Sequence, residues 1–150
     1  SKQVACDAGK YSGSGADECI DCEAGTYQDA TGQSSCKLAD GGSFVDAMGA
    51  SEQRECPAGS FSGSASGKCD DCAAGTFQVL TGQSSCALAG QGFYAGNTGA
   101  SEQTACPAGS FSGSGASECL DCEAGTYQDA TGQSSCKLAE AGSFVASTGA

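Results

Sequence analysis

The sequence predicts a small disulfide-rich fold of β-hairpins and irregular segments, arranged as an elongated solenoid-like rod of short modules. Three observations predict it. Leu, Ile, Val and Phe together supply only 16 of the 150 residues, too few for one conventional hydrophobic core. Cysteine supplies 12 residues, a density typical of extracellular proteins, because cytosolic thiols stay reduced. The chain also repeats itself with a period of 50 residues.

The repeat divides the chain into three periods, residues 1–50, 51–100 and 101–150. The first and third periods are identical at 38 of 50 positions, and the middle period keeps every cysteine in register. No shift in composition separates the periods. We therefore expect one continuous rod, and we expect it to be an excerpt of a longer array.

Each period contains three modules, and each module is a third of a period in length. Every module opens with a turn that ends in Gly, and an aromatic residue follows two positions later. We expect these glycines to adopt positive φ and the short extended arms to form a hairpin. Nine modules fill the chain, and we number them 1 to 9 by their first residues, Cys6, Cys22, Ala39, Cys56, Cys72, Ala89, Cys106, Cys122 and Ala139.

Nine of the ten aromatic residues occupy this one position, one in each module. A single ring has too little around it to be buried inside so small a module. We therefore expect each ring to pack against the turn of the adjacent module, with each module contacting only its neighbours. The alternative is that the rings are exposed binding residues, although such residues rarely recur in every repeat.

Modules 3, 6 and 9 lack cysteine. Ala39, Ala89 and Ala139 stand at the opening position, and Gln53 and Gln103 stand at the closing position. Four cysteines per period allow three connectivities, which spacing alone does not separate. A module that closes on itself loses both ends when one bond is lost, which is the pattern seen. We therefore favour pairing within modules: Cys6–Cys19, Cys22–Cys36, Cys56–Cys69, Cys72–Cys86, Cys106–Cys119 and Cys122–Cys136.

The charge balance argues against several functions. Eighteen acidic residues against six basic ones give a net charge of −12, so we expect no nucleic-acid partner. No apolar run approaches the roughly 20 residues of a membrane span, so we expect no membrane insertion in this segment. The absence of His excludes Ser–His and Cys–His catalysis and His-ligated metal sites. We accordingly expect a non-enzyme with no catalytic residue, metal or cofactor.

The chain contains three C-x-x-C motifs, Cys19–Cys22, Cys69–Cys72 and Cys119–Cys122. Such motifs can also form metal or redox sites instead of structural disulfides. As half of a zinc site, each motif would need a second C-x-x-C knuckle, which is absent. A site made from all four cysteines of one period stays open as an alternative to disulfides. A thioredoxin-like redox motif needs a surrounding βαβ pattern, which is missing.

Acidic pairs such as Asp17 and Glu18, or Asp21 and Glu23, could bind calcium together with neighbouring carbonyl groups. The chain has no EF-hand or nonapeptide calcium pattern, however. Asp17 is replaced by Gly67 and Ser117 in the other periods. We therefore favour a solvated acidic face, whose charge promotes solubility and mutual repulsion.

The modules resemble the ephrin-receptor-like cysteine-rich repeat, whose pattern is C-x-x-G-[ST]-[YF]…G…C-x-x-C. Module 2 carries this pattern as Cys22-Glu-Ala-Gly25-Thr-Tyr27, followed by Gly32-Gln-Ser-Ser-Cys36. The resemblance covers the whole chain and extends to the first module of tumour-necrosis-factor-receptor-type domains. It implies an elongated, disulfide-laddered architecture in extracellular or cell-surface proteins, and it implies no activity. The modules without cysteine depart from the pattern.

Two functions fit these observations. The first is an extracellular structural repeat protein that forms a rod or filament, such as an appendage, fibre or surface coat. Its partners would be further copies or continuing repeats, arranged head to tail. The second is the stalk or ligand-binding ectodomain of a cell-surface receptor or adhesin. The uniformity of the repeats favours the first function, because a specific binding site needs unique residues. The most variable stretch, Ala87–Asn97, has no charged cluster that would mark such a site.

Glycosylation is expected on hydroxyl groups only. The single Asn, Asn97, is followed by Thr98-Gly99, so no Asn-x-Ser/Thr acceptor exists. Ser and Thr together make up a fifth of the chain, which leaves O-linked glycans as the common route. The alternative is that these small polar residues serve only as turn formers.

Overall fold

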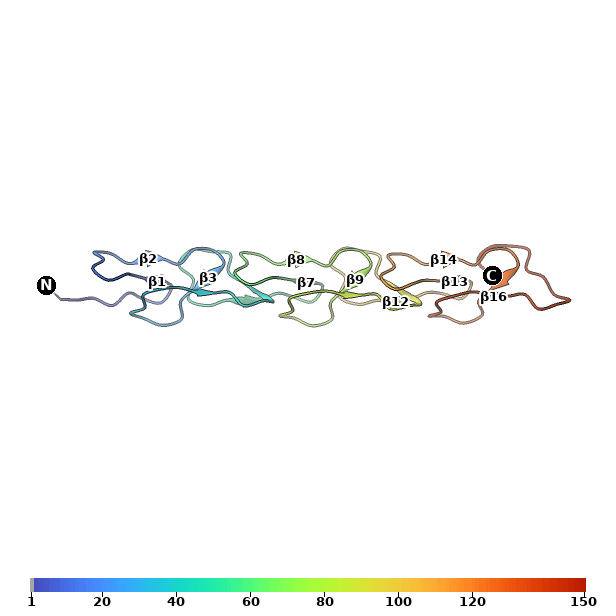
Figure 1. The fold of residues 1–150 in the computed structure, drawn as a ribbon, viewed down its shortest axis with the longest axis horizontal. Coiled ribbons are helices and arrows are strands. Elements are labelled where there is room, and N and C mark those ends of the chain that lie inside the picture. The colour runs from blue at the N-terminus through green and yellow to red at the C-terminus, as the bar shows by residue number, and fades with distance from the viewer. Residues whose placement is uncertain (1) are drawn as a thin grey trace. The chain divides into compact units, whose positions relative to one another are not determined.

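The structure is a computed structural model that describes residues 2–150, a range that contains short strands and no helix (Figure 1). Each strand has two residues and pairs with the strand next to it in sequence. The strands are β1 (Lys10–Tyr11), β2 (Ile20–Asp21), β3 (Thr26–Tyr27), β4 (Lys37–Leu38), β5 (Ser43–Phe44), β6 (Arg54–Glu55), β7 (Ser60–Phe61), β8 (Asp70–Asp71), β9 (Thr76–Phe77), β10 (Ala87–Leu88), β11 (Phe93–Tyr94), β12 (Thr104–Ala105), β13 (Ser110–Phe111), β14 (Leu120–Asp121), β15 (Thr126–Tyr127) and β16 (Lys137–Leu138).

Each hairpin follows directly from its module's opening turn. In module 2, the Thr26 N–H closes the turn by donating to the Glu23 carbonyl at 2.9 Å, and Gly25 has φ of 84°. The antiparallel pair then places Tyr27 opposite Lys37. All nine turn glycines have φ between 81° and 88°, which confirms the predicted positive φ. The predicted class, disulfide-rich with hairpins and irregular segments, is confirmed as well.

The described chain forms two compact units. The first unit runs to Asp70 and includes Leu80–Ser85, and the second comprises Asp71–Val79 and Cys86–Ala150. Both units use one pattern of hydrogen bonds to join successive modules. In the first, the Gly25 N–H donates to the Val45 carbonyl at 2.8 Å. In the second, the Gly75 N–H donates to the Ala95 carbonyl at 2.7 Å. A sequence repeat has thus become a repeat of backbone contacts.

Contacts also reach past the neighbouring module. A Cβ added to Gly25 in module 2 would clash with the carbonyl oxygen of Ala65 in module 4. A Cβ added to Gly75 in module 5 would clash with the carbonyl oxygen of Gly115 in module 7. The expectation that each module contacts only its neighbours is therefore wrong. Two-residue strands make each module so thin that its turn reaches the second module along.

The core consists of small side chains. The buried apolar residues are those at the module openings and those that follow the aromatic position: Cys6, Cys22, Ala39, Val45, Cys56, Cys72, Ala89, Ala95, Cys106 and Cys122. Polar side chains share this core and are paired. Ser62, 1% exposed, donates from Oγ to the Ser43 carbonyl at 2.9 Å. Gln28 donates from Nε2 to the Ser35 carbonyl at 2.6 Å. Burial is therefore supported by hydrogen bonding rather than by large apolar groups.

The aromatic rings are only partly buried, whereas the sequence predicted that each would be buried against the turn of the adjacent module. Eight of the nine are half-buried, and Phe144 is 86% exposed. The outer faces of some rings meet cations, as where the Arg54 guanidinium lies 4.7 Å from the centroid of Phe44. The physical reason is the close approach of backbones between modules, since a gap that excludes a Cβ leaves no room for a ring.

These close approaches make a testable prediction at Gly42. Its φ is 87°, and an added Cβ would clash with the Gly82 carbonyl two modules along. We expect Gly42→Ala to lower the free energy of unfolding by at least about 2 kcal/mol, because it combines backbone strain with overpacking. Denaturant unfolding monitored by circular dichroism would measure this. Gly63→Ala is the matched control, because no heavy atom lies within 4 Å of that position, and its effect should stay within about 0.5 kcal/mol.

Candidate functional site

The cysteines are the first candidate residues, and the structure joins all 12 in disulfides that each lie within one module. The bonded Cα atoms are 5.7 to 5.8 Å apart. The opening cysteines are buried and the closing ones are half-buried. The two cysteines of a C-x-x-C motif, such as Cys19 and Cys22, therefore belong to successive disulfides.

Modules 3 and 6 replace the disulfide with a side-chain hydrogen bond. Gln103, at the vacant closing position of module 6, accepts at Oε1 from the Gly90 N–H at 2.7 Å. In module 3, Gln53 Oε1 accepts a hydrogen bond from the Asp40 N–H at 2.8 Å, and Gln53 Nε2 donates to the Asp40 carboxylate. The buried Ala39 and Ala89 take the place of the opening cysteines. The two ends of these modules therefore stay joined, by a hydrogen bond worth about 1 kcal/mol instead of a covalent bond.

Modules 2 and 8 carry identical clusters of three side chains on their surface. In module 2, Lys37 Nζ lies 2.6 Å from Asp29 Oδ1 and 6.0 Å from the centroid of Tyr27. The hydrogen bond from Lys37 lowers the pKa of the Asp29 carboxyl, and the same bond raises the pKa of Lys37. All three groups remain accessible to water, so this ion pair contributes little to stability.

Module 5 departs from that pattern at all three positions. Phe77, Val79 and Ala87 stand where modules 2 and 8 have Tyr, Asp and Lys. Val79 is 60% exposed, and Leu88 beside Ala87 is 63% exposed. The second unit therefore presents an uncharged surface at these positions, which we call the apolar patch and define as Phe77, Val79 and Ala87. It is the clearest break in the surface chemistry of the repeat.

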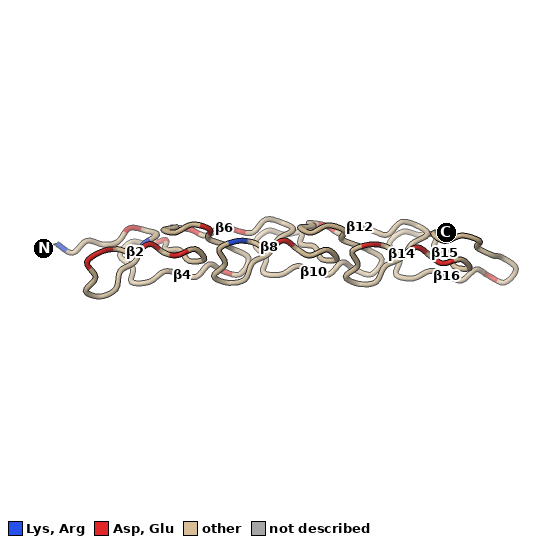
Figure 2. The backbone as a smooth tube through the Cα atoms, turned by 90° about the horizontal axis from the view of Figure 1, so that it is seen from above, with Lys and Arg blue, Asp and Glu red and all other residues tan. Residues whose placement is uncertain are grey.

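Asp and Glu residues are spread along the backbone of both units, with few Lys and Arg residues among them (Figure 2). Asp21, from the acidic pairs considered for calcium, is bound to Lys10 at 2.9 Å, and that hydrogen bond raises the pKa of Lys10. Asp17 and Glu18 are exposed. No group of three or more His, Cys, Asp or Glu within residues 2–150 has the geometry to hold a metal ion.

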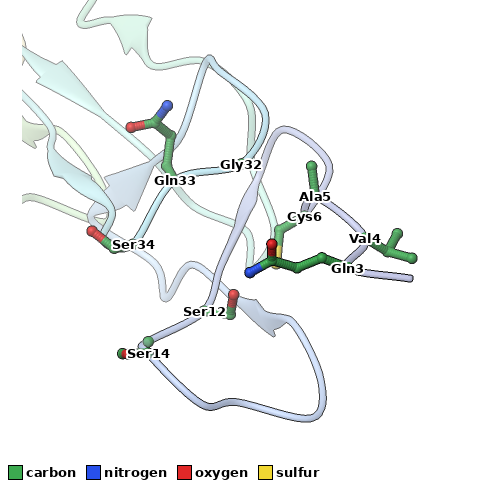
Figure 3. Close-up of a pocket in the computed structure, with 10 residues that line it drawn as sticks. Gln3, Val4, Ala5, Cys6, Ser12, Ser14, Gly32, Gln33 and Ser34 are labelled. Carbon is green, nitrogen blue, oxygen red and sulfur yellow. The ribbon is translucent and has the colours of Figure 1, made fainter. Parts of the chain in front are cut away.

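An open hollow lies near Cys6 in the first unit (Figure 3). Its wall includes Ser12 and the segment Gly32, Gln33 and Ser34, so two successive modules contribute to it. The lining mixes polar side chains with Val4, Ala5 and Cys6 and contains no charged residue.

These features define a tandem array of small, disulfide-bonded hairpin modules joined by backbone hydrogen bonds. The family model described as "Tyrosine-protein kinase ephrin type A/B receptor-like" matches residues 9–56, 59–106 and 109–150. The chain belongs to this ephrin-receptor-like family, which confirms the resemblance found in the sequence. A comparison with curated proteins found no match.

Membership in this family has direct consequences. Repeats of this kind are cysteine-rich ectodomain modules rather than catalytic domains, and they indicate an extracellular receptor-type module. Their disulfides agree with an extracellular or secreted protein. No helix in residues 2–150 has the length and apolar character needed to cross a membrane.

Sequence reasoning missed two features of the site. One is the replacement of the missing disulfide by Gln53 or Gln103, although the recurrence of Gln at the closing position was a usable signal. The other is the contact across two modules. The second glycine found in most modules, such as Gly82, signalled that contact, because its carbonyl oxygen lies against the turn glycine Gly42.

The disulfide pairing makes a prediction for peptide mapping without reduction. We expect six linked peptide pairs, each from one module, and no free thiol, because both ends of a bond lie in the same hairpin. A peptide that links Cys19 to Cys36, or Cys36 to Cys56, would contradict this pairing.

The hydrogen bond in module 6 makes a further prediction. Gln103→Ala leaves the Gly90 N–H without its partner, so we expect the free energy of unfolding to fall by about 1 to 2 kcal/mol. Gln133→Ala is the control, because that side chain donates only to the nearby Thr131 carbonyl. Its effect should stay within about 0.5 kcal/mol. Equal effects of the two substitutions in denaturant unfolding would contradict the role given to Gln103.

Proposed function

We propose that this chain is a structural segment of an extracellular protein, an extended rod that builds a filament, fibre or surface coat. The observation that supports this most is the uniform set of backbone bonds between modules. The Gly42 N–H donates to the Ser62 carbonyl at 2.8 Å, and one period further on the Gly92 N–H donates to the Ser112 carbonyl at 2.9 Å. Contacts that recur at each step add modules in one direction instead of closing a globule.

The surface chemistry supports the same proposal. A net charge of −12 keeps such rods soluble and apart. Exposed hydroxyl groups such as Thr31, Ser34 and Thr98 are available to carry O-linked glycans. Glycans at these positions would shield backbone that no thick core protects. Ser and Thr residues would therefore both form the turns and carry the glycans.

A second candidate is the stalk or ligand-binding ectodomain of a cell-surface receptor or adhesin. Family membership and the apolar patch favour it, because the patch gives one module residues that the others lack. Changing Phe77, Val79 and Ala87 to the Tyr, Asp and Lys of modules 2 and 8 would restore uniformity. Loss of cell binding by that variant, with unchanged folding, would favour the receptor function over the structural one.

Small-angle X-ray scattering on the chain tests the structural proposal. A compact domain of this length has a radius of gyration of about 15 Å, and we expect a value well above that. Electron microscopy of the native material should show rods or filaments, and its mass should exceed that of the polypeptide because of glycans. A radius close to about 15 Å would contradict the rod, and an unglycosylated native chain would contradict the coat.

A further inference from the structure

The hairpin of module 6, formed by β11 and β12, encloses an open hollow of about 460 Å³. All the residues that line it belong to the second unit. Tyr94 lines the hollow together with Thr104, its partner across the hairpin. The loop between the two strands supplies the rest of the lining, including Asn97, Thr98, Ser101 and Glu102. The hollow therefore combines one aromatic ring with neutral polar groups and a carboxylate.

Module 3 shows how the repeat fills the corresponding space. Phe44 pairs with Arg54 across the hairpin of module 3, as Tyr94 pairs with Thr104 in module 6. The Arg54 side chain forms an ion pair with Asp46. Its guanidinium lies 4.7 Å from the centroid of Phe44. In module 3, an ion pair thus lies beside the aromatic ring and covers it.

Module 6 lacks both members of that ion pair. Gly96 stands where module 3 has Asp46, and Thr104 takes the place of the arginine. A Cβ built on Gly96 would lie 3.6 Å from Cε2 of Tyr94, so a side chain at this position would rest against the ring. The two substitutions therefore remove the groups that would otherwise occupy the space beside Tyr94.

Further differences make the loop of module 6 more polar than that of module 3. Asn97 replaces Ala47, and Thr98 replaces Met48. Both polar side chains are exposed, so their hydrogen-bonding groups are accessible to a ligand. Tyr94 also carries a hydroxyl group that the phenylalanine of module 3 lacks. The differences between the two modules thus open a space and surround it with groups that donate and accept hydrogen bonds.

A sugar ring fits this combination of groups. One face of a pyranose consists of C–H groups that can pack on an aromatic ring, and its rim carries hydroxyl groups. Amide and hydroxyl side chains donate to and accept from such hydroxyls, and a carboxylate accepts from two of them. Sites for small molecules generally combine apolar contact with a few placed polar groups.

The lining argues against charged ligands. Among the described residues it contains no Lys or Arg, the side chains that bind phosphates and carboxylates through charge-assisted hydrogen bonds. Glu102 is the one carboxylate in that lining, whereas divalent cations take several oxygen ligands. The net charge of −12 also repels acidic sugars. The chemistry of the hollow is therefore that of an uncharged sugar.

We propose that the hollow of module 6 binds a neutral sugar unit of a glycan. The ring of Tyr94 packs against the C–H face of the sugar, and Asn97 and Glu102 hydrogen-bond to its hydroxyl groups. This binding site goes beyond the structural function proposed above and does not depend on it. Because one ring and a few hydrogen bonds contact the sugar, we expect a dissociation constant of about 1 to 10 mM for a single unit.

Nuclear magnetic resonance titration of the isotope-labelled chain measures this binding. The probes are the methyl pyranosides of glucose, galactose, mannose and N-acetylglucosamine, in which the methyl group stands for the rest of a glycan. We expect at least one of them to shift the amide signals of residues 96–102 in a saturable manner. The methyl glycoside of glucuronic acid should bind at least about tenfold more weakly than that sugar, because the chain repels it.

A double variant, Gly96→Asp with Thr104→Arg, closes the hollow by restoring the ion pair of module 3. The φ of Gly96 is not positive, and a Cβ there would lie 3.5 Å from its nearest neighbour, the Ser117 carbonyl oxygen. The fold therefore admits the change, which leaves the net charge unaltered. We expect the affinity for the sugar to fall by at least about tenfold.

The matched control for the double variant is Val79→Asp with Ala87→Arg. It adds the same two charged groups to the apolar patch, outside the lining of the hollow. The control should bind the sugar as the unchanged chain does. A loss of affinity shared by both double variants would show that the added charges act without closing the hollow, and would contradict the site.

Asn97→Ala tests one polar contact separately. The substitution removes an exposed amide, so the fold is retained, and we expect the affinity to fall about three- to tenfold. Gln133→Ala is its control, because this exposed amide of module 8 lies outside the lining. Should the double variant fail to fold, the comparison of Asn97→Ala with Gln133→Ala decides the matter.

Three results would overturn the inference: no saturable shift with any of the four neutral sugars up to about 50 mM, affinity that the double variant and Asn97→Ala leave unchanged, or tighter binding of the acidic sugar than of the neutral ones. Circular dichroism of each variant establishes that it is folded before its affinity is compared.

Discussion

The close approach of turn glycines to backbone carbonyls is the constraint on which the structure depends. Gly25 and Gly75 each lie where a Cβ would strike a carbonyl two modules along. Positive φ and contact with another backbone are both conditions that glycine meets without strain. Because the backbone supplies the bonds between modules, side chains are left to fill small gaps, which explains a core of Cys, Ala and Ser.

The disulfides stabilise each module internally, whereas the turn glycines allow contact between modules. The bonded cysteines are separated by 13 or 14 positions in the sequence. A covalent bond that closes a loop of this size restricts the unfolded chain, an effect worth roughly 3 kcal/mol in the chain-entropy model. Modules 3 and 6, which lack this bond, hold their ends together through Gln53 and Gln103. They retain the fold because the bonds to neighbouring modules are the same as elsewhere.

Uniform backbone contacts and a variable surface allow the two kinds of function to coexist. The contacts between modules involve few side-chain identities, so the surface can change without loss of the fold. Modules 2 and 8 carry an ion pair beside an aromatic ring, while module 5 carries Phe77, Val79 and Ala87 at the same positions. An extracellular array of such modules with one distinct patch is therefore compatible with either a structural role or a receptor-type role.

The sequence by itself determined the class of fold, the module boundaries and the positive φ of the turn glycines. These are local properties, set by the spacing of Cys, Gly and aromatic residues within a single module. Only the tertiary structure decided that Gly42 meets Gly82, that Phe44 stays half-buried, and that Gln103 replaces a disulfide. Those contacts depend on how far one thin module reaches along the next two, which no local pattern encodes.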